Sequence, residues 1–292
     1  MRWPGRQIPG PKPRLDVTDR VVLITGAAQG IGRALARHLH AQGAAVALVD
    51  VDTEAVGRAA NELGGNAIGL AADVRDRPGM AQAVAAAVRH FGRLDVVVAN
   101  AGVTPAPSTL RMMDGDDFDR VIGINLTGVF NTVRPALEHV IAGGGHVVVV
   151  SSGAAFTPGA AGSPYMISKA AVEQFGRALR LELAGLGTTV QIAYFGIVDT
   201  AMTHAVLDAD DLGRRLGAML PWPLNRRITA EQAAKSVADG IRNRAATTMA
   251  PAVWHIYSWL RGAANPVLDH LLTKDTAMSE LLHDLEKEQT AP

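Results

Sequence analysis

Short apolar segments alternate with longer amphipathic segments through most of the chain. The apolar segments are hydrophobic on both faces, which is typical of strands buried in a parallel sheet. They comprise residues 21–25, 45–49, 67–70, 94–99, 146–151, 189–194 and 247–250. Apolar residues recur at helical spacing in residues 31–42, 53–63, 80–91, 118–141, 163–186 and 230–242. This alternation predicts an α/β fold, a Rossmann-like doubly wound parallel β-sheet of about seven strands with helices on both faces.

The two ends of the chain depart from this alternation. Residues 1–14 contain four prolines and four basic side chains, so we expect no helix there. Residues 1–18 are predicted to form a Pro-rich basic arm, either a solvated tail or an arm that packs on a neighbouring subunit. No repeat, long linker or change of composition marks a second folded domain, so residues 19–252 are expected to form one domain. Residues 253–292 form an aromatic and then acidic extension.

The overall composition excludes several classes of protein. The 292 residues include 28 Lys and Arg against 28 Asp and Glu, and this balance disfavours a nucleic-acid binder. A hydrophobic fraction of 48% excludes intrinsic disorder. Because the chain has no cysteine, it has no disulfide, thiolate metal site or cysteine nucleophile, which fits a cytoplasmic protein. No apolar run is long enough to span a membrane, and the first residues do not resemble a signal peptide.

A glycine-rich turn follows the first predicted strand and opens the next helix. The sequence TGAAQGIG at residues 25–32 lets the backbone turn sharply and bring amide donors to a phosphate at the helix N-terminus. We therefore expect a dinucleotide pyrophosphate here, against the alternative of a tight turn without a ligand. The candidate residues are Gly26, Gln29, Gly30, Ile31 and Gly32. Asp50 ends the next strand, where its carboxylate can accept hydrogen bonds from ribose hydroxyls or cap the following helix.

Tyr165 and Lys169 are spaced so that both lie on one face of a predicted helix. Oxidising an alcohol requires a base, and a free tyrosine, with a pKa of about 10, is a poor base at neutral pH. A fixed cation beside the phenol stabilises the phenolate, and Lys169 is the candidate for that cation. Ser152 lies at the end of a strand upstream of Tyr165 and is placed to hydrogen-bond a substrate oxygen.

The spacing Gly-x-x-x-Gly-x-Gly in the turn, together with Tyr-x-x-x-Lys and the upstream Ser152, resembles the short-chain dehydrogenase/reductase family. The resemblance implies that residues 19–252 form an NAD-binding domain of this family. It implies four catalytic residues, which are Asn125, Ser152, Tyr165 and Lys169. In that set Tyr165 is the general acid/base, Lys169 also binds the nicotinamide ribose, and Asn125 positions a water. Ser151 is the rival serine, but its spacing to Tyr165 differs from that of the family.

The resemblance also implies the remaining cofactor contacts. They are Asp73 and Val74 at the adenine, Asn100, Ala101 and Gly102 beside the central strands, and Gly196, Val198 and Thr200 near the carboxamide, with Tyr165 and Lys169 completing the set. Two positions depart from the family pattern. Ala99 stands where the family has its first asparagine, and Phe195 replaces the usual proline, so an aromatic side chain is expected near the nicotinamide.

The charge around Asp50 favours NAD over NADP. A 2′-phosphate would meet the Asp50 carboxylate at close range, and this repulsion disfavours NADP. The positions where NADP-preferring relatives carry a base are Gln29 and Val51, and neither is cationic. Val51 is also expected to contact the cofactor beside Asp50. We therefore expect the chain to prefer NAD+ and NADH. The alternatives are an NADPH-dependent carbonyl reductase and a non-catalytic NAD-binding sensor, although a sensor has no need of the proton-transfer residues.

Two other chemistries find no support in the sequence. The chain has no Gly-x-Ser-x-Gly elbow and no histidine in a triad context, which argues against a serine hydrolase. The spacing of histidines and carboxylates indicates no metal site.

Residues 201–225 correspond to the variable substrate loop of the family. Its Met, Leu and Trp side chains favour an apolar pocket for a small hydrophobic alcohol or ketone, in particular a secondary alcohol, against the alternative of an amphipathic lid packed on the domain. The candidate substrate residues are Ser152, Tyr165, Phe195, Met202, His204 and Trp222.

The extension begins with the aromatic residues Trp254, Tyr257 and Trp259. This cluster is expected to pack on the domain or on a partner subunit, to cover the substrate site, or to lie in a membrane interface, but the acidic balance after Leu272 disfavours the membrane. The family resemblance further implies a homotetramer or homodimer built from the long helices around Asn125 and Tyr165.

Overall fold

The computed structural model describes residues 13–209, 211–219 and 222–290, so most of the basic arm lies outside the described residues. Seven parallel strands form the central sheet in the order β3-β2-β1-β4-β5-β6-β9. They are β1 (Val21–Thr25), β2 (Ala45–Asp50), β3 (Ala67–Ala71), β4 (Val96–Ala99), β5 (His146–Val150), β6 (Thr189–Phe195) and β9 (Thr247–Ala250). The predicted doubly wound sheet is confirmed.

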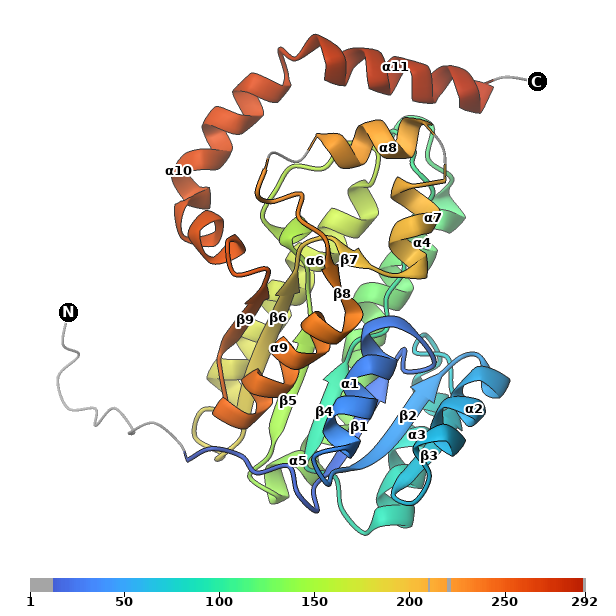
Figure 1. Cartoon of the computed structure of the whole chain (residues 1–292), viewed down its shortest axis with the longest axis vertical. Helices are drawn as coiled ribbons and strands as arrows, with labels where there is room; N and C mark the ends of the chain where they lie inside the picture. The colour runs from blue at the N-terminus through green and yellow to red at the C-terminus, as the bar shows by residue number, and fades with distance from the viewer. Residues whose placement is uncertain (1–12, 210, 220–221, 291–292) are drawn as a thin grey trace, which may run out of the picture.

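Helices cover both faces of this sheet (Figure 1). One face packs against α1 (Gly30–His40), α2 (Thr53–Leu63) and α9 (Ala230–Asn243), and the other against α3 (Arg77–Phe91), α5 (Gly128–Ala142) and α6 (Ser163–Glu182). Because successive strand side chains point to opposite faces, Val22 and Ile24 join the first layer and Val21 and Leu23 join the second. Apolar residues at both sets of positions therefore explain the burial of the strands on both faces.

The sheet reverses its order between β1 and β4. Strands β2 and β3 extend the sheet from one edge of β1, whereas β4, β5 and β6 follow on the other edge. Crevices for ligands form at such a point, outside the carboxyl ends of the strands. Thr25 and Ala99 end the two strands, and the glycine-rich turn and Asn100 follow them directly.

The long helix predicted over residues 118–141 is interrupted in the structure. It consists of α4 (Gly115–Ile122), a π-helical turn (Gly123–Thr127) and α5. Asn125 lies in this turn and is fully buried. A π-helical turn is a local insertion within an α-helix and commonly marks a functional position. Because the helix continues on both sides of it, the apolar periodicity did not predict this turn.

The residues after β6 build a layer above the carboxyl edge of the sheet. This layer contains the short strand pair β7 (Val198–Asp199) and β8 (Ile228–Thr229), and the helices α7 (Ala201–Leu207) and α8 (Asp211–Ala218). After β9, α10 (Trp254–Leu272) bends away from the sheet and α11 (Thr276–Thr290) crosses over α8 (Figure 1). A short 3-10 turn, Gly153–Ala155, follows β5.

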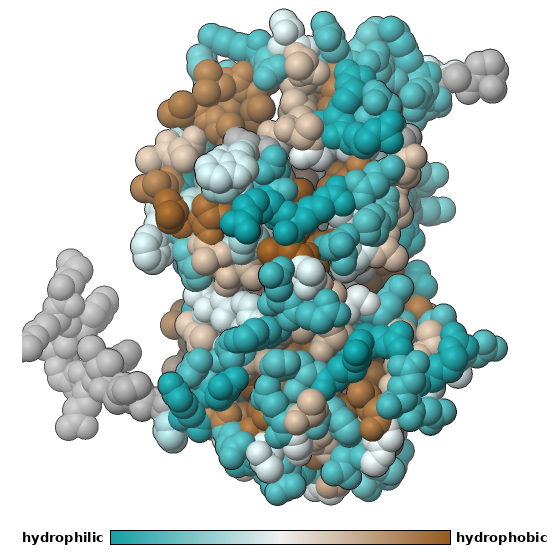
Figure 2. All heavy atoms as spheres, in the orientation of Figure 1, coloured by the Kyte–Doolittle hydropathy of each residue, from teal (hydrophilic) through white to brown (hydrophobic). Residues whose placement is uncertain are grey.

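The three aromatic residues at the start of α10 have different environments. Trp254 is 2% exposed and Tyr257 packs beside it, whereas Trp259 is 82% exposed. Hydrophobic side chains gather on the surface over α10 (Figure 2), and Ile256, Leu260, Val267 and Leu271 are exposed there. Within the described residues, no helix has the length and hydrophobicity required to cross a membrane.

Candidate active site

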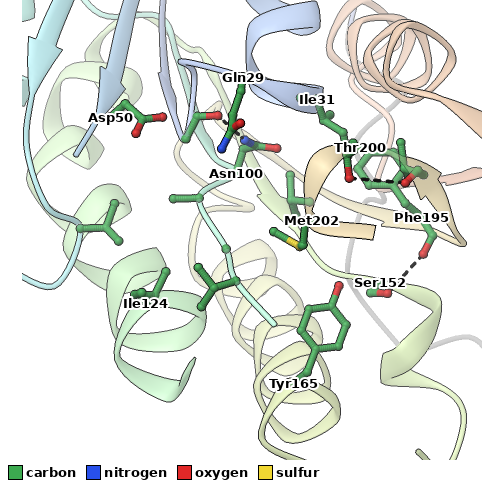
Figure 3. A pocket seen from close by; sticks show the side chains of 18 of the residues that line it. Gln29, Ile31, Asp50, Asn100, Ile124, Ser152, Tyr165, Phe195, Thr200 and Met202 are labelled. Carbon is green, nitrogen blue, oxygen red and sulfur yellow. Dashed lines mark hydrogen bonds between the residues drawn. The ribbon is translucent and has the colours of Figure 1, made fainter. Parts of the chain in front are cut away.

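A cavity of about 370 Å³ opens at the carboxyl edge of the sheet, at the point where the strand order reverses. Most of the sequence-predicted residues line it (Figure 3). They are Gly26, Gln29, Gly30, Ile31, Asp50, Val51, Asp73, Val74, Asn100, Ala101, Gly102, Ser152, Tyr165, Lys169, Phe195, Gly196, Val198, Thr200 and Met202. The structure thus brings together residues from the ends of six strands of the central sheet, from β7 and from α1, α6 and α7.

The glycine-rich turn presents free backbone donors to the cavity. Gly26 and Gly30 have φ values of +63° and +54°, which a side chain would strain. A Cβ at Gly26 would lie 2.9 Å from the Ala101 Cα, so only glycine allows this close approach. No side chain caps α1 at Gln29, and its first turn has no acidic residue. The exposed amides and the helix dipole therefore fit a pyrophosphate.

Asp50 lies between this turn and the following helix. Its carboxylate accepts hydrogen bonds from the backbone N–H groups of Ala28 at 3.0 Å and Asp52 at 3.3 Å. The helix cap is instead the side chain of Asp52, which accepts from the Ala55 N–H. Asp50 is therefore not the cap of α2 and faces the cavity with unused acceptor positions, as ribose binding requires.

Asn100 joins the ends of the two central strands. Its side-chain amide donates to the carbonyl oxygens of Thr25 at 2.9 Å and Gly26 at 3.2 Å, and its backbone N–H donates to the Thr25 hydroxyl at 3.1 Å. This network holds the glycine-rich turn against β4. Gly32 does not line the cavity and instead packs against the Gly26 carbonyl and the Asn100 side chain, where a Cβ would not fit.

Tyr165, Ser152 and Met202 converge on one end of the cavity (Figure 3). Ser152 Oγ donates to the Phe195 carbonyl at 3.3 Å, accepts from the Ala154 N–H at 3.2 Å, and shares a hydrogen bond with Tyr165. Desolvation raises the pKa of the Tyr165 phenol above its ordinary value, and the hydrogen bond with Ser152 acts in the opposite direction. The phenol therefore carries its proton at neutral pH in this environment.

Lys169 lies one helical turn from Tyr165 and is buried. Its Nζ donates to the Val150 carbonyl at 3.0 Å and lies 5.6 Å from the centre of the Tyr165 ring. Burial lowers the pKa of the Lys169 ammonium to about 8, because desolvation disfavours the charged form. The ammonium is therefore still charged at neutral pH. It lies beside the Tyr165 phenol, whose phenolate form it is expected to stabilise.

Asn125, in the π-helical turn, contacts α6 through Ser168 and does not line the cavity. Its side-chain oxygen accepts from the Val103 N–H at 2.8 Å, and its amide donates to the Val103 carbonyl at 2.9 Å and to Ser168 Oγ at 3.1 Å. These bonds tie the segment after β4 to α6, which carries Tyr165 and Lys169. The side chain thus braces the two elements between which a substrate would lie.

Comparison with known proteins agrees with this geometry. A family model described as short chain dehydrogenase matches residues 20–211, which include the glycine-rich turn and all four expected catalytic residues. The chain belongs to the short-chain dehydrogenase family.

This short-chain dehydrogenase also has named relatives. It is 37% identical over 223 residues to the cis-4-hydroxycyclohexanecarboxylate dehydrogenase of Sinomonas cyclohexanicum, covering 75% of this chain and 88% of the relative. It is 39% identical over 185 residues to the (-)-trans-carveol dehydrogenase of Rhodococcus erythropolis, covering 58% of this chain and 67% of the relative. A crystal structure of 3-ketoacyl-(acyl-carrier-protein) reductase from Brucella melitensis complexed with NADH matches with a TM-score of 0.70 and 26% identity, over 80% of this chain and 97% of that chain.

The substrate side of this dehydrogenase differs in part from expectation. Phe195 lines the cavity, but its ring is buried in the cluster that includes Val198 and the α9 layer, and its carbonyl meets Ser152. His204 is not in the cavity lining, because its ring bonds the carboxylates of Asp199 and Asp208, each at 2.7 Å.

Trp222 is 79% exposed and does not line the cavity either. Residues 210, 220 and 221 of the expected substrate loop lie outside the described residues.

Sequence reasoning missed several residues that line the cavity of this dehydrogenase. They are Ala72, Arg75, Val103, Ile124, Val150, Ser151, Ala201 and Thr203. Arg75 is the only charged one among them, and its guanidinium donates to the Asp73 carboxylate from Nε at 2.9 Å and from Nη2 at 2.6 Å. This hydrogen bond holds the pKa of Asp73 below its ordinary range. The sequence could have suggested Arg75, because it follows the expected adenine contact Asp73 by two residues.

Proposed function

We propose that this short-chain dehydrogenase is an NAD-dependent enzyme that interconverts a hydrophobic secondary alcohol, in particular a ring alcohol, and its ketone. The observation that carries the proposal is that Tyr165 lies between Ser152, which shares a hydrogen bond with it, and Lys169, whose Nζ is 5.6 Å from the centre of its ring, in a cavity that also fits a dinucleotide. The relatives named for a hydroxycyclohexane carboxylate and for carveol support the ring alcohol. Val103 and Met202 support a hydrophobic substrate, because they line the cavity.

The residues present fit the dinucleotide along its whole length. The amides at the start of α1 would hold the pyrophosphate, Asp50 the adenosine ribose, and Asp73 and Val74 the adenine. Lys169 would hold the nicotinamide ribose, and Val198 and Thr200 the carboxamide. Gly30 and Thr200 come close across the cavity, since a Cβ at Gly30 would lie 3.6 Å from Thr200 Cγ2. When bound, the nicotinamide supplies the acceptor for the hydride that leaves the carbinol carbon.

The side chains of the protein carry out the proton transfer of the same reaction. In the oxidation direction the Tyr165 phenolate takes the hydroxyl proton, and the alcohol becomes a ketone as its hydride leaves. Ser152 donates a hydrogen bond to the substrate oxygen in place of the Phe195 carbonyl, and Lys169 stabilises the phenolate. Because the pKa of Tyr165 is raised, oxidation should accelerate as the pH increases, whereas the protonated phenol serves ketone reduction at neutral pH.

We further propose that residues 19–252 form the catalytic domain and that the chain acts in the cytoplasm as a homo-oligomer. The family match over residues 20–211 supports the domain and the homo-oligomer that the family resemblance implies, and the absence of cysteine fits the cytoplasm.

Replacement of Tyr165 tests the proposed function. Purified protein should bind NADH in a fluorescence titration and should reduce NAD+ with members of a panel of cyclic secondary alcohols. Tyr165→Phe should lower turnover by about 10²–10⁴-fold, the usual contribution of a general acid/base, with NADH affinity close to that of the wild type. Tyr257→Phe is the matched control, because this hydroxyl bonds Asn265 outside the cavity. Turnover of Tyr165→Phe at the wild-type rate would contradict the mechanism.

A further inference from the structure

Helix α11 crosses over α8, above the carboxyl edge of the sheet, and contacts parts of the chain that are far apart in sequence (Figure 1). Leu281 and Leu285 are 4% and 6% exposed, because they form a cluster with Leu212 of α8 and with Ala161, which lies between β5 and α6. Leu216 and Met219 pack against the same cluster. The apolar face of α11 is thus buried against two segments of the catalytic domain.

The polar face of α11 reaches a third segment, residues 107–111. Glu286 accepts hydrogen bonds from the Thr109 hydroxyl at 2.7 Å and from Arg111 Nε at 3.2 Å. Gln289 donates to the Pro107 carbonyl at 3.1 Å. On the other side of the helix, Asp284 forms an ion pair of 2.9 Å with Arg215 of α8. Apolar burial and ion pairs therefore act together on one helix.

Each of these three segments lies close in sequence to a residue that lines the cavity on the side of Tyr165. Residues 107–111 follow Val103, Ala161 precedes Tyr165, and α8 follows Met202 of α7. The first two segments are also bonded to each other, since the Ser108 N–H donates to the Ala161 carbonyl at 3.0 Å. Helix α11 thus contacts three segments, here called the walls, that adjoin residues of the cavity lining in sequence.

We propose that α11 is a strap that holds the substrate side closed, so that the enzyme accepts compact alcohols and excludes alcohols carried on a long thioester-linked carrier. The inference rests on the proposed function. A carrier-bound substrate must pass its chain between the walls while its hydroxyl reaches Tyr165, whereas a compact ring alcohol can be enclosed completely. The matching acyl-carrier-protein reductase structure is aligned over nearly its whole length but over only 80% of this chain, so part of this chain has no counterpart in it.

Two variants of α11 in the full-length chain test the strap. The first combines Leu281→Ser with Leu285→Ser and removes the apolar anchor, and the second is Glu286→Gln, which weakens the contacts to Thr109 and Arg111. Their matched controls are Leu271→Ser, at an exposed leucine of α10, and Glu288→Gln, at an exposed glutamate of α11. The substrates are cyclohexanol and 3-hydroxybutyryl-coenzyme A, each with NAD+, and the quantity compared is the ratio of their kcat/KM values.

We expect the double serine variant to shift this ratio toward the thioester by about tenfold or more, as the loss of two buried leucines implies. Glu286→Gln should shift it by about two- to fivefold, in the range of a partly exposed ion pair. The controls should retain the wild-type ratio, and all variants should bind NADH with wild-type affinity, because α11 does not line the cavity. An unchanged ratio in the double variant would overturn the proposal.

Backbone amide exchange provides a readout that does not depend on turnover. Residues 104–112 and 201–209 should exchange at least about tenfold faster in the double serine variant, with β1 and α1 unchanged. Faster exchange confined to α11 would show that the helix does not hold these walls and would overturn the strap, even in a protein that oxidises cyclohexanol. Failure of the wild-type chain to oxidise every alcohol offered would instead contradict the proposed function.

Discussion

The carboxylate of Asp50 and the backbone N–H of Ala28 are joined by a hydrogen bond of 3.0 Å. This bond fixes the acidic group at the end of β2 against the glycine-rich turn at the end of β1. Among the residues that the structure describes, two cationic side chains line the cavity. Arg75 is paired with Asp73, and Lys169 is buried beside Tyr165, where it donates to the Val150 carbonyl. A 2′-phosphate beside Asp50 would therefore face a fixed negative charge without a free cation from the lining.

Replacing this carboxylate should relax the choice of coenzyme. Asp50→Asn removes the charge, so we expect the ratio of NADPH to NADH affinity to rise by about 10- to 100-fold, through weaker NADH binding and tighter NADPH binding. Fluorescence titration with both coenzymes measures the ratio. Asp52→Asn is the control, because this neighbour caps α2 and does not line the cavity. An unchanged ratio in Asp50→Asn would show that another feature selects the coenzyme.

The expected site residues that line the cavity share a local signature. Gly26 follows β1 directly, Gly30 begins α1 and Asp50 ends β2, and the carboxyl ends of parallel strands meet at one edge of the sheet. Tyr165 and Lys169 lie four residues apart on one helix, so their proximity follows from helix geometry. The placement of these residues therefore needed only the type and order of the elements.

Other features depend on contacts that no local pattern contains. Glu286 reaches Arg111 across 175 residues of sequence, so the position of α11 could not be predicted from either segment. His204 lies in the expected substrate loop, but its ring is held by the carboxylates of Asp199 and Asp208. The π-helical turn at Asn125 was hidden because a helix interrupted by one extra residue retains most of its apolar periodicity.

Lys169 should reduce the stability of the fold at neutral pH. The pKa of Lys169 is about 8 in the folded protein, below the ordinary 10.5. At a pH where Lys169 is charged in both the folded and the unfolded protein, its buried charge therefore destabilises the folded protein. The shift corresponds to about 3 kcal/mol. The unfolded chain binds more protons between pH 8 and 10.5, so this contribution makes the free energy of unfolding rise with pH in that window. Below pH 8 the full cost is present.

The variant Lys169→Met isolates this contribution. It should be more stable than the wild type at pH 7, and its advantage should shrink by about 3 kcal/mol as the pH rises from 8 to 10.5. Urea unfolding at a series of pH values measures the free energy of unfolding of the variant and of the wild type. Subtracting one from the other at each pH removes the contribution of all other titrating groups, which the two proteins share. The same variant should have lost turnover of cyclic alcohols. A stability difference that does not change with pH would show that Lys169 is not a buried cation at pH 7.

Trp254 braces the two loops that meet at Ser152. A Cβ at Gly153 would lie 2.7 Å from the indole Cη2, and the indole Nε1 packs against Gly196, the residue after the carbonyl that Ser152 binds. Trp254→Phe leaves a gap at this contact, so we expect a loss of about 1–2 kcal/mol of stability and a roughly tenfold lower kcat from displacement of Ser152. Steady-state kinetics and urea unfolding measure both, with Trp259→Phe as the exposed control. If kcat stays at the wild-type value while stability falls, Trp254 supports the core alone.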